Sequence, residues 1–170
     1  AVDEGKTPVL AVGLSAIHKA HLAAALGLDT GRPVLVLTDD DNAANRFAAD
    51  LRGFSERDVV QLPSRELVMA DVVGVSRGYE QRRLAALDEL TEAHFAVASV
   101  QAAAQRTMPP EALKAAIVSL ATGETAPLDE LTHALTRAGY ERCVQVEGTG
   151  QFSIRGGILD VFPPQAEHPY

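Results

Sequence analysis

The stretch RPVLVLTDDDNAANRFAADL, residues 32–51, joins an apolar run to an amphipathic segment. Its first half, PVLVLTD, is a continuous apolar run of the kind found in strands that are covered on both faces. In its second half, Ala44, Phe47, Ala48 and Leu51 recur at the spacing that lays one apolar stripe along a helix. A strand followed directly by such a helix predicts a parallel βαβ unit.

The same alternation of apolar runs and helical patterns extends on both sides of this stretch. We predict a helix over Asn42–Phe54, with Asp41 or Asn42 as its N-terminal cap and Gly53 near its end. Further elements are expected in this order: a strand over residues 8–14, a helix over Ala16–Leu26, a strand near Asp58–Ser64, a helix over Tyr79–Thr91 and a strand over Phe95–Val100. Residues 1–120 are therefore predicted to form an α/β domain with a parallel sheet flanked by helices.

The pattern changes after residue 120. Pro127 can begin a helix and Gly139 can end it. The apolar face of this helix would consist of Leu128, Leu131, Leu135 and Ala138. The next segments alternate apolar and polar residues, and their apolar members are Val144, Val146, Phe152 and Ile154. This period of two predicts half-buried antiparallel strands, so residues 121–170 are expected to form a small α+β domain.

The composition narrows the class of protein. The 170 residues carry 15 Lys and Arg against 23 Asp and Glu, and the net charge of -8 argues against a surface that grips nucleic-acid backbones throughout. The single cysteine, Cys143, cannot form an internal disulfide, and no zinc-ligand spacing is present. No apolar run approaches the roughly 20 residues of a membrane span. We therefore expect a cytoplasmic protein with no membrane partner and no structural metal.

The segment GLSAIHKA, residues 13–20, follows an apolar run and opens a predicted helix, where a phosphate-binding loop would lie. Gly13 and Lys19 match the pattern G-x-x-x-x-G-K-[ST], but His18 stands at the second glycine and Ala20 at the hydroxyl residue. An imidazole does not let the backbone amides close around a phosphate, and a methyl group cannot coordinate Mg²⁺. We interpret the segment as a degenerate phosphate loop or an ordinary turn before a helix.

An active nucleotide-binding enzyme domain is the alternative. It would use Lys19 together with Asp39, Asp40 and Asp41, which end a predicted strand where open α/β sheets often place binding groups. The same aspartates suit a loop that caps the next helix. We favour the capping interpretation because aspartate is so strongly preferred at such positions.

Arg155 stands beside the double glycine of GQFSIRGGILDVFPP, residues 150–164. The period of two places Arg155 on a polar face with Gln151 and Ser153. The adjacent glycines leave the guanidinium accessible, so it could offer its planar donors to the carboxylate of a partner. An ion pair with Asp160 across the hairpin explains the same pattern. The residues alone leave these two alternatives open.

The run GQFSIRGGILDVFPPQAEHPY, residues 150–170, resembles the N-terminal module of the bacterial transcription-repair coupling factors, the Mfd family. The matching segment of the excision-repair protein UvrB is more loosely similar. Supporting segments extend the resemblance over residues 8–170, among them LPSRE, SRGYEQRRLAALDEL, FAVASVQAAAQR and LTHALTRAGYERCVQVE. A UvrB-type domain fits less well, because UvrB carries an intact phosphate loop and a long DNA-gripping hairpin.

The resemblance implies a division of labour. Residues 1–120 would be part of a UvrB-like first domain with the degenerate loop, and residues 121–170 would be the truncated start of a small domain that binds UvrA. Arg155 would be a partner contact, with Gln151 and Ser153 as further candidates. The resemblance implies no catalytic residue, metal or cofactor in these residues. In the family, the motor that uses ATP and Mg²⁺, the DNA translocation and the RNA polymerase contacts belong to other parts of the chain.

Overall fold

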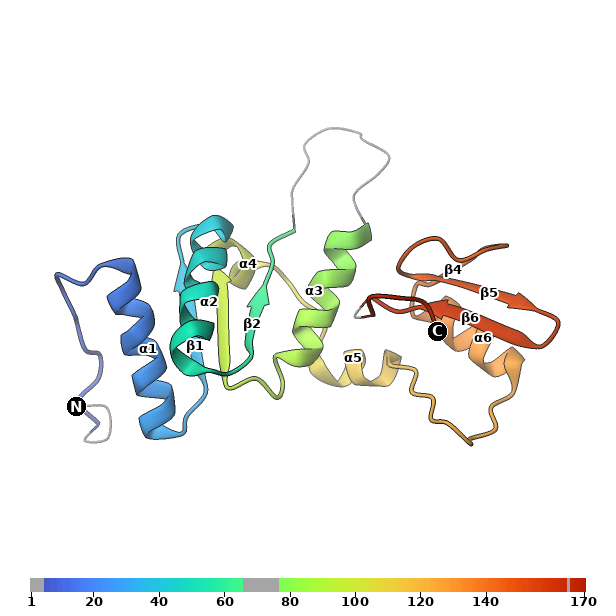
Figure 1. Cartoon of the computed structure of the whole chain (residues 1–170), viewed down its shortest axis with the longest axis horizontal. Coiled ribbons are helices and arrows are strands. Elements are labelled where there is room, and N and C mark those ends of the chain that lie inside the picture. The colour runs from blue at the N-terminus through green and yellow to red at the C-terminus, as the bar shows by residue number, and fades with distance from the viewer. Residues whose placement is uncertain (1–4, 66–76, 165) are drawn as a thin grey trace. The chain divides into compact units, whose positions relative to one another are not determined.

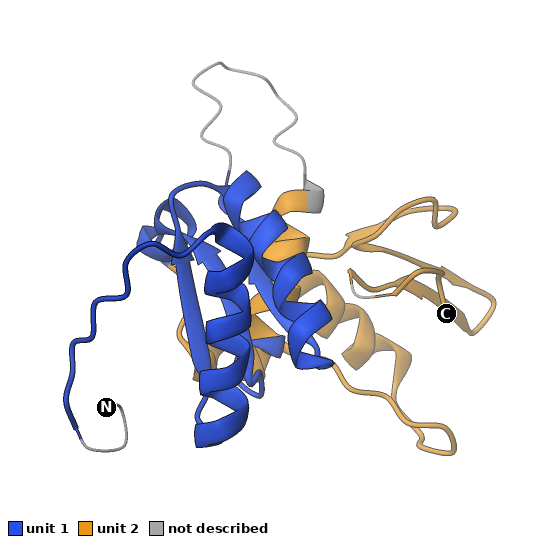
Figure 2. Cartoon of the chain, turned by 60° about the vertical axis from the view of Figure 1, so that its left-hand side comes forward, with its two compact units in different colours: residues 1–66, 89–106 blue, residues 67–88, 107–170 orange. Residues whose placement is uncertain are grey.

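The computed structural model describes residues 5–65, 77–164 and 166–170. The chain divides into two compact units, one of residues 1–66 and 89–106 and the other of residues 67–88 and 107–170 (Figure 2). Across the described ranges, no helix is both long and apolar enough to cross a membrane. These units do not test the domain boundary expected at residue 120, which stays a prediction.

The first unit is an α/β structure. Its helices and strands are α1 (Ala16–Thr30), β1 (Val34–Thr38), α2 (Asp41–Ser55), β2 (Val59–Leu62), β3 (Phe95–Ser99) and the short α4 (Val100–Ala104). The sheet has the spatial order β1-β3-β2, and both pairs of strands are parallel (Figure 1). Val34 and Val59 both lie opposite Phe95, so the three strands start in step. The predicted parallel sheet with flanking helices is confirmed.

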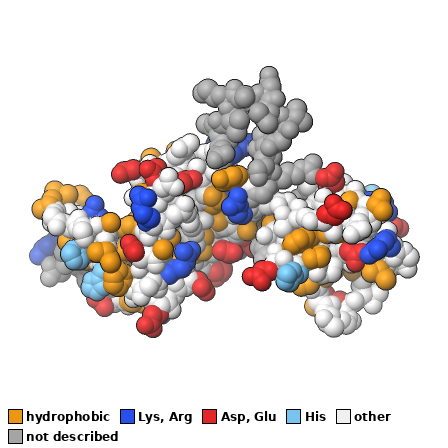
Figure 3. All heavy atoms as spheres, turned by 45° about the horizontal axis from the view of Figure 1, so that its top comes forward, with side chains coloured by type: hydrophobic (Ala, Val, Ile, Leu, Met, Phe, Trp, Pro, Cys, Tyr) orange, Lys and Arg blue, Asp and Glu red, His pale blue; other side chains and the backbone are white. Residues whose placement is uncertain are grey.

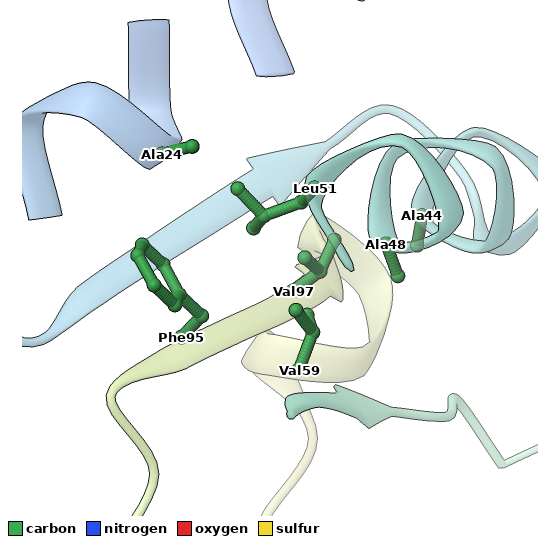
Figure 4. Packing of buried hydrophobic residues seen from close by; sticks show 7 residues of the cluster. All are labelled: Ala24, Ala44, Ala48, Leu51, Val59, Phe95 and Val97. Atoms are coloured by element: carbon green, nitrogen blue, oxygen red, sulfur yellow. The ribbon is translucent and has the colours of Figure 1, made fainter. Parts of the chain in front are cut away.

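The core of this unit lies between the helices and one face of the sheet. Its buried members are Ala24 of α1, Ala44, Ala48 and Leu51 of α2, and Val59, Phe95 and Val97 of the strands (Figure 4). The α2 residues are those whose spacing predicted an apolar stripe, and Phe47 packs against the cluster as a partly buried neighbour. Phe95 and Val97 share a face because side chains alternate along a strand.

Helix α2 begins and ends at other residues than the sequence suggested. Its N-terminal cap is Asp40, whose carboxylate accepts a hydrogen bond from the Ala43 N–H at 2.7 Å. Asp41 was a candidate cap, but its carboxylate instead accepts hydrogen bonds from the N–H and hydroxyl of Ser64, at 3.1 and 2.6 Å. At the other end Gly53 lies inside the helix, and Glu56, with a φ of 52°, is the C-terminal cap.

The strand predicted over residues 8–14 is wrong. In the structure this segment has no strand conformation, and Val9, Leu10 and Val12 expose 60%, 87% and 78% of their surface. A strand needs the backbone of a neighbour for its hydrogen bonds, and β1, β2 and β3 pair only with one another in the described sheet. An apolar run alone therefore did not determine pairing.

The second unit contains α3 (Arg77–Glu89, except its last residue), α5 (Pro110–Ala116), α6 (Leu128–Arg137), β4 (Glu141–Arg142), β5 (Gln151–Arg155) and β6 (Ile158–Phe162). Its sheet has the order β4-β5-β6, with β4 and β5 parallel and β5 and β6 antiparallel. This small mixed sheet confirms the predicted α+β character. Helix α6 also follows the prediction, since Pro127 precedes it and Gly139, with a φ of 90°, lies just after it.

The predicted strand around Val144 and Val146 is wrong, because both residues lie outside the strands. The N–H of Cys143 donates to the Phe152 carbonyl at 2.9 Å, which continues the pairing of β4 with β5 by one residue. The chain then leaves the ladder, and Val144 is 89% exposed. Phe152 is the largest fully buried side chain among the described residues of this unit.

We predict opposite effects on stability for alanine at two helical glycines. At buried Gly27 of α1, the new methyl group would lie only 2.7 Å from Cζ of Phe95, so the ring or the helix must shift. Such overpacking typically costs about 1–3 kcal/mol. At Gly53 nothing lies within 4 Å, and the higher helix propensity of alanine should add roughly 0.5–1 kcal/mol. Urea unfolding of Gly27→Ala and Gly53→Ala measures both changes, and a Gly27→Ala variant as stable as Gly53→Ala would contradict this packing.

We also predict that Asp40→Ala destabilises the chain by about 1 kcal/mol, because the N–H of Ala43 loses its acceptor at the start of α2. Asp39→Ala is the matched control, since Asp39 is exposed and has the same charge. Thermal unfolding of the two variants separates the cap from the general loss of an aspartate. Equal unfolding midpoints for both variants would show that the cap contributes nothing.

Candidate functional site

The candidate site is the hairpin of β5 and β6. Arg155 lies opposite Ile158, so Gly156 and Gly157 alone form the turn between the strands. Their φ values are 57° and 93°, in the left-handed region where other residues are strained. Two consecutive residues of this conformation match the right-handed twist of a hairpin. The turn therefore places Arg155 at the very end of β5.

The Arg155 guanidinium forms one ion pair and remains largely accessible. Its Nη2 donates to Oδ2 of Asp160 at 2.7 Å, and the side chains of Arg155 and Asp160 are 65% and 28% exposed. The ion pair with Asp160, which was one of the two alternatives from the sequence, is thus present. It does not bury the guanidinium, which has several further N–H donors and no other hydrogen bond to the described residues. Both alternatives for this arginine are therefore physically compatible.

Ser153 does not share the exposure of Arg155. The serine lies on the same face of β5, two residues before the arginine, but it is only 1% exposed. Its hydroxyl donates to the carbonyl of Val144 at 2.9 Å. The period of two was correct for the direction of the side chain. It could not show that a segment from outside the strand would cover it.

Gln151 shapes the loop that precedes β5. Its Oε1 accepts hydrogen bonds from the N–H groups of Glu147 and Gly148, at 2.9 and 3.0 Å. The side chain is half-buried, so its carbonyl oxygen is already used within the chain. A direct role for Gln151 or Ser153 in binding a partner stays a prediction.

Sequence reasoning missed Gln81, which lies on α3 in the same unit. Its Nε2 donates to the Thr149 carbonyl at 3.1 Å, and its Oε1 accepts from the Thr149 hydroxyl at 2.6 Å. A Cβ on Gly150 would overlap the Gln81 amide, so the glycine leaves room for this contact. The two partners are 68 residues apart, and no local pattern in the sequence signals their contact.

The segment around Gly13 does not have the geometry of a phosphate loop. Ser15 occupies the N-cap position of α1 without a capping hydrogen bond from its side chain, and its hydroxyl lies 3.1 Å from Nδ1 of His18. Ala20 is fully buried, whereas Lys19 is exposed on the first turn of the helix. A phosphate loop connects a strand to a helix, and no described strand precedes α1. His18, at the position of the second glycine, thus contacts Ser15 in the turn, and Ala20, at the position of the hydroxyl residue, lies in the core.

The aspartates after β1 mainly stabilise the next helix. Asp40 caps α2 and Asp41 accepts the two hydrogen bonds from Ser64, while Asp39 is exposed. This arrangement supports the capping interpretation over a nucleotide site. No group of three potential metal ligands was found within the described ranges.

Among the described residues, charges outside the hairpin do not converge on a site. Figure 3 shows basic and acidic side chains interspersed on the face in view. An open groove of about 1080 Å³ in the first unit is lined by side chains of both signs, and Arg52 there donates to the Val59 carbonyl at 2.7 Å. In the second unit, burial raises the pKa of the Tyr140 hydroxyl above its ordinary value of 10.0, so this side chain stays neutral. None of these groups adds reactive chemistry to the hairpin.

The comparisons with known proteins place the hairpin in a matched region. A family model described as the UvrB interaction domain matches residues 118–170, which contain α6 and the whole hairpin. The chain is similar to the transcription-repair-coupling factor of Bacillus subtilis, with 34% identity over 99% of this chain. It is similar to those of Myxococcus xanthus and Mycobacterium tuberculosis, with 32% and 35% identity over 92% of this chain.

The match covers only a small part of these relatives. The chain spans 14% of the Bacillus and Myxococcus proteins and 13% of the Mycobacterium protein. The resemblance first carried by residues 150–170 is confirmed by all of these matches. The chain is homologous to the N-terminal region, about 14%, of the transcription-repair-coupling factors and includes their UvrB interaction domain.

Proposed function

We propose that this chain is a non-catalytic docking module that recruits UvrA in transcription-coupled nucleotide excision repair. The observation that carries the proposal is the exposed Arg155, held at a tight glycine turn inside the region that matches the UvrB interaction domain. The family resemblance assigns UvrA as the partner of this region. The chemistry of the hairpin suits recognition by contact rather than catalysis.

Arginine is well suited to such a contact. Its planar donors can bind a carboxylate at two points, and arginine is enriched among the residues that dominate binding energy in interfaces. Pairing of β5 with β6 limits the main-chain freedom of Arg155, and the ion pair with Asp160 restrains its guanidinium. A restrained side chain loses less conformational entropy on binding, so more of the contact energy remains.

In the same proposal, catalysis belongs to the longer protein. The motor that binds ATP and Mg²⁺, moves on DNA and displaces stalled RNA polymerase would be formed by other regions of the relatives' length. The net charge of -8 disfavours DNA as a direct ligand of this region. His18 and Ala20 stand where a phosphate loop has a glycine and a hydroxyl residue, and His18 contacts the Ser15 hydroxyl instead. These departures support a module that does not bind nucleotide.

The first test measures binding of UvrA by titration calorimetry. Arg155→Ala should weaken binding by about 2 kcal/mol or more, roughly 30-fold, because a charged contact in the interface is lost. Arg46→Ala is the control, since Arg46 is an exposed arginine on α2 in the other unit. Wild-type chain that does not bind UvrA, or Arg155→Ala that binds as tightly as wild type, would overturn the proposal.

The second test concerns the alternative of a nucleotide-binding enzyme domain. The observation that favours this alternative is Lys19, which is exposed at the start of α1 and could contact a phosphate. A ligand at 100 times its dissociation constant should stabilise its receptor by about 2.7 kcal/mol. We expect no rise in the unfolding temperature with ATP and Mg²⁺, and no difference between wild type and Lys19→Ala. A stabilisation that disappears in Lys19→Ala would favour the enzyme domain.

A further inference from the structure

Two exposed apolar side chains lie on the face of the small sheet that presents Arg155. The first is Ile158, which lies directly opposite Arg155 across the turn. Directly opposed residues of an antiparallel pair project from the same face of the sheet. Ile158 is 65% exposed. The face that presents the guanidinium therefore also presents an isoleucine.

The second apolar side chain is Val144. Ser153 projects from the same face as Arg155, and its hydroxyl donates to the Val144 carbonyl. The main chain at Val144 therefore covers this face at Ser153, two residues before Arg155. The side chain of Val144 points away from the contact, because the residue is 89% exposed. Two segments of the second unit thus bring apolar surface to the same side as Arg155.

This combination matters because an exposed ion pair is weak in water. An arginine and a carboxylate on open surfaces contribute about 0–1 kcal/mol, since solvent screens their attraction. Apolar contacts around such a pair exclude water when a partner binds, and the lower dielectric strengthens the attraction. Ile158 lies opposite Arg155, and Val144 lies in the segment that covers Ser153 on the same face, so both are placed to provide such contacts.

We propose that Arg155, Ile158 and Val144 form one docking surface, and that it takes a segment of UvrA in which a carboxylate lies beside aliphatic or aromatic side chains. This inference rests on the proposed function and defines the chemistry of the partner. Asp160 occupies one N–H of the guanidinium, so the incoming carboxylate binds the remaining donors. Charge complementarity selects the carboxylate, and the two exposed side chains select its apolar neighbours.

The test uses threonine substitutions, because threonine keeps the branch at Cβ but carries a hydroxyl in place of one methyl group of valine or the ethyl group of isoleucine. Ile158→Thr and Val144→Thr should each weaken UvrA binding about fivefold, since apolar surface no longer leaves water. Both variants should also give a less negative heat-capacity change of binding. Val12→Thr is the matched control, because Val12 is 78% exposed in the other unit. We expect it to bind as wild type.

The outcomes separate this inference from the function on which it rests. Loss of binding in Arg155→Ala with unchanged binding in both threonine variants would overturn the apolar surface and leave the UvrA module intact. Failure of the wild-type chain to bind UvrA would overturn both. Sedimentation of the chain without UvrA measures its oligomeric state. A dimer of this chain that dissociates in Ile158→Thr would assign the surface to a second copy instead of UvrA.

Discussion

The turn of Gly156 and Gly157 is the constraint on which the candidate site depends. Its length fixes the register of β5 against β6, and a shift of one residue would send every side chain of one strand to the opposite face. The register buries Phe152 and at the same time exposes Arg155. Stability of the small unit and presentation of the arginine are thus consequences of the same backbone geometry, because the buried face cannot form unless the polar face is also set.

Local periodicity predicted much of this fold. The stripe that includes Ala48 and Leu51 identified α2, and the alternation around Phe152 identified β5, because each pattern reflects the geometry of one element. Contacts between distant residues were beyond this reasoning. Asp41 accepts a hydrogen bond from Ser64, and the N-terminal cap of α2 is Asp40 instead. Ser64 lies after the next strand, so no residue within α2 could have indicated this contact.

The candidate site shows the same limit more sharply. Arg155, its turn and its pairing with Asp160 followed from residues close in sequence. Burial of Ser153 did not, because it depends on where the chain runs after it leaves β4. The apolar run before α1 failed for a related reason, since strand conformation depends on a partner that a single segment cannot specify. Sequence patterns thus specify the faces of an element more reliably than what will cover them.

The overall charge of the chain limits how the proposed docking surface would recognise a carboxylate. A net charge of -8 gives an acidic partner no general attraction at long range, and salt shortens the reach of individual charges to roughly 8–10 Å. In the proposed docking, recognition of a carboxylate would therefore come from donors that meet it at contact distance. Arg155 offers such donors from the end of a strand, where neighbouring glycines add no side chains to obstruct them. Apolar neighbours on the same face then matter more than additional charge, because they remove the water that would otherwise weaken a single ion pair.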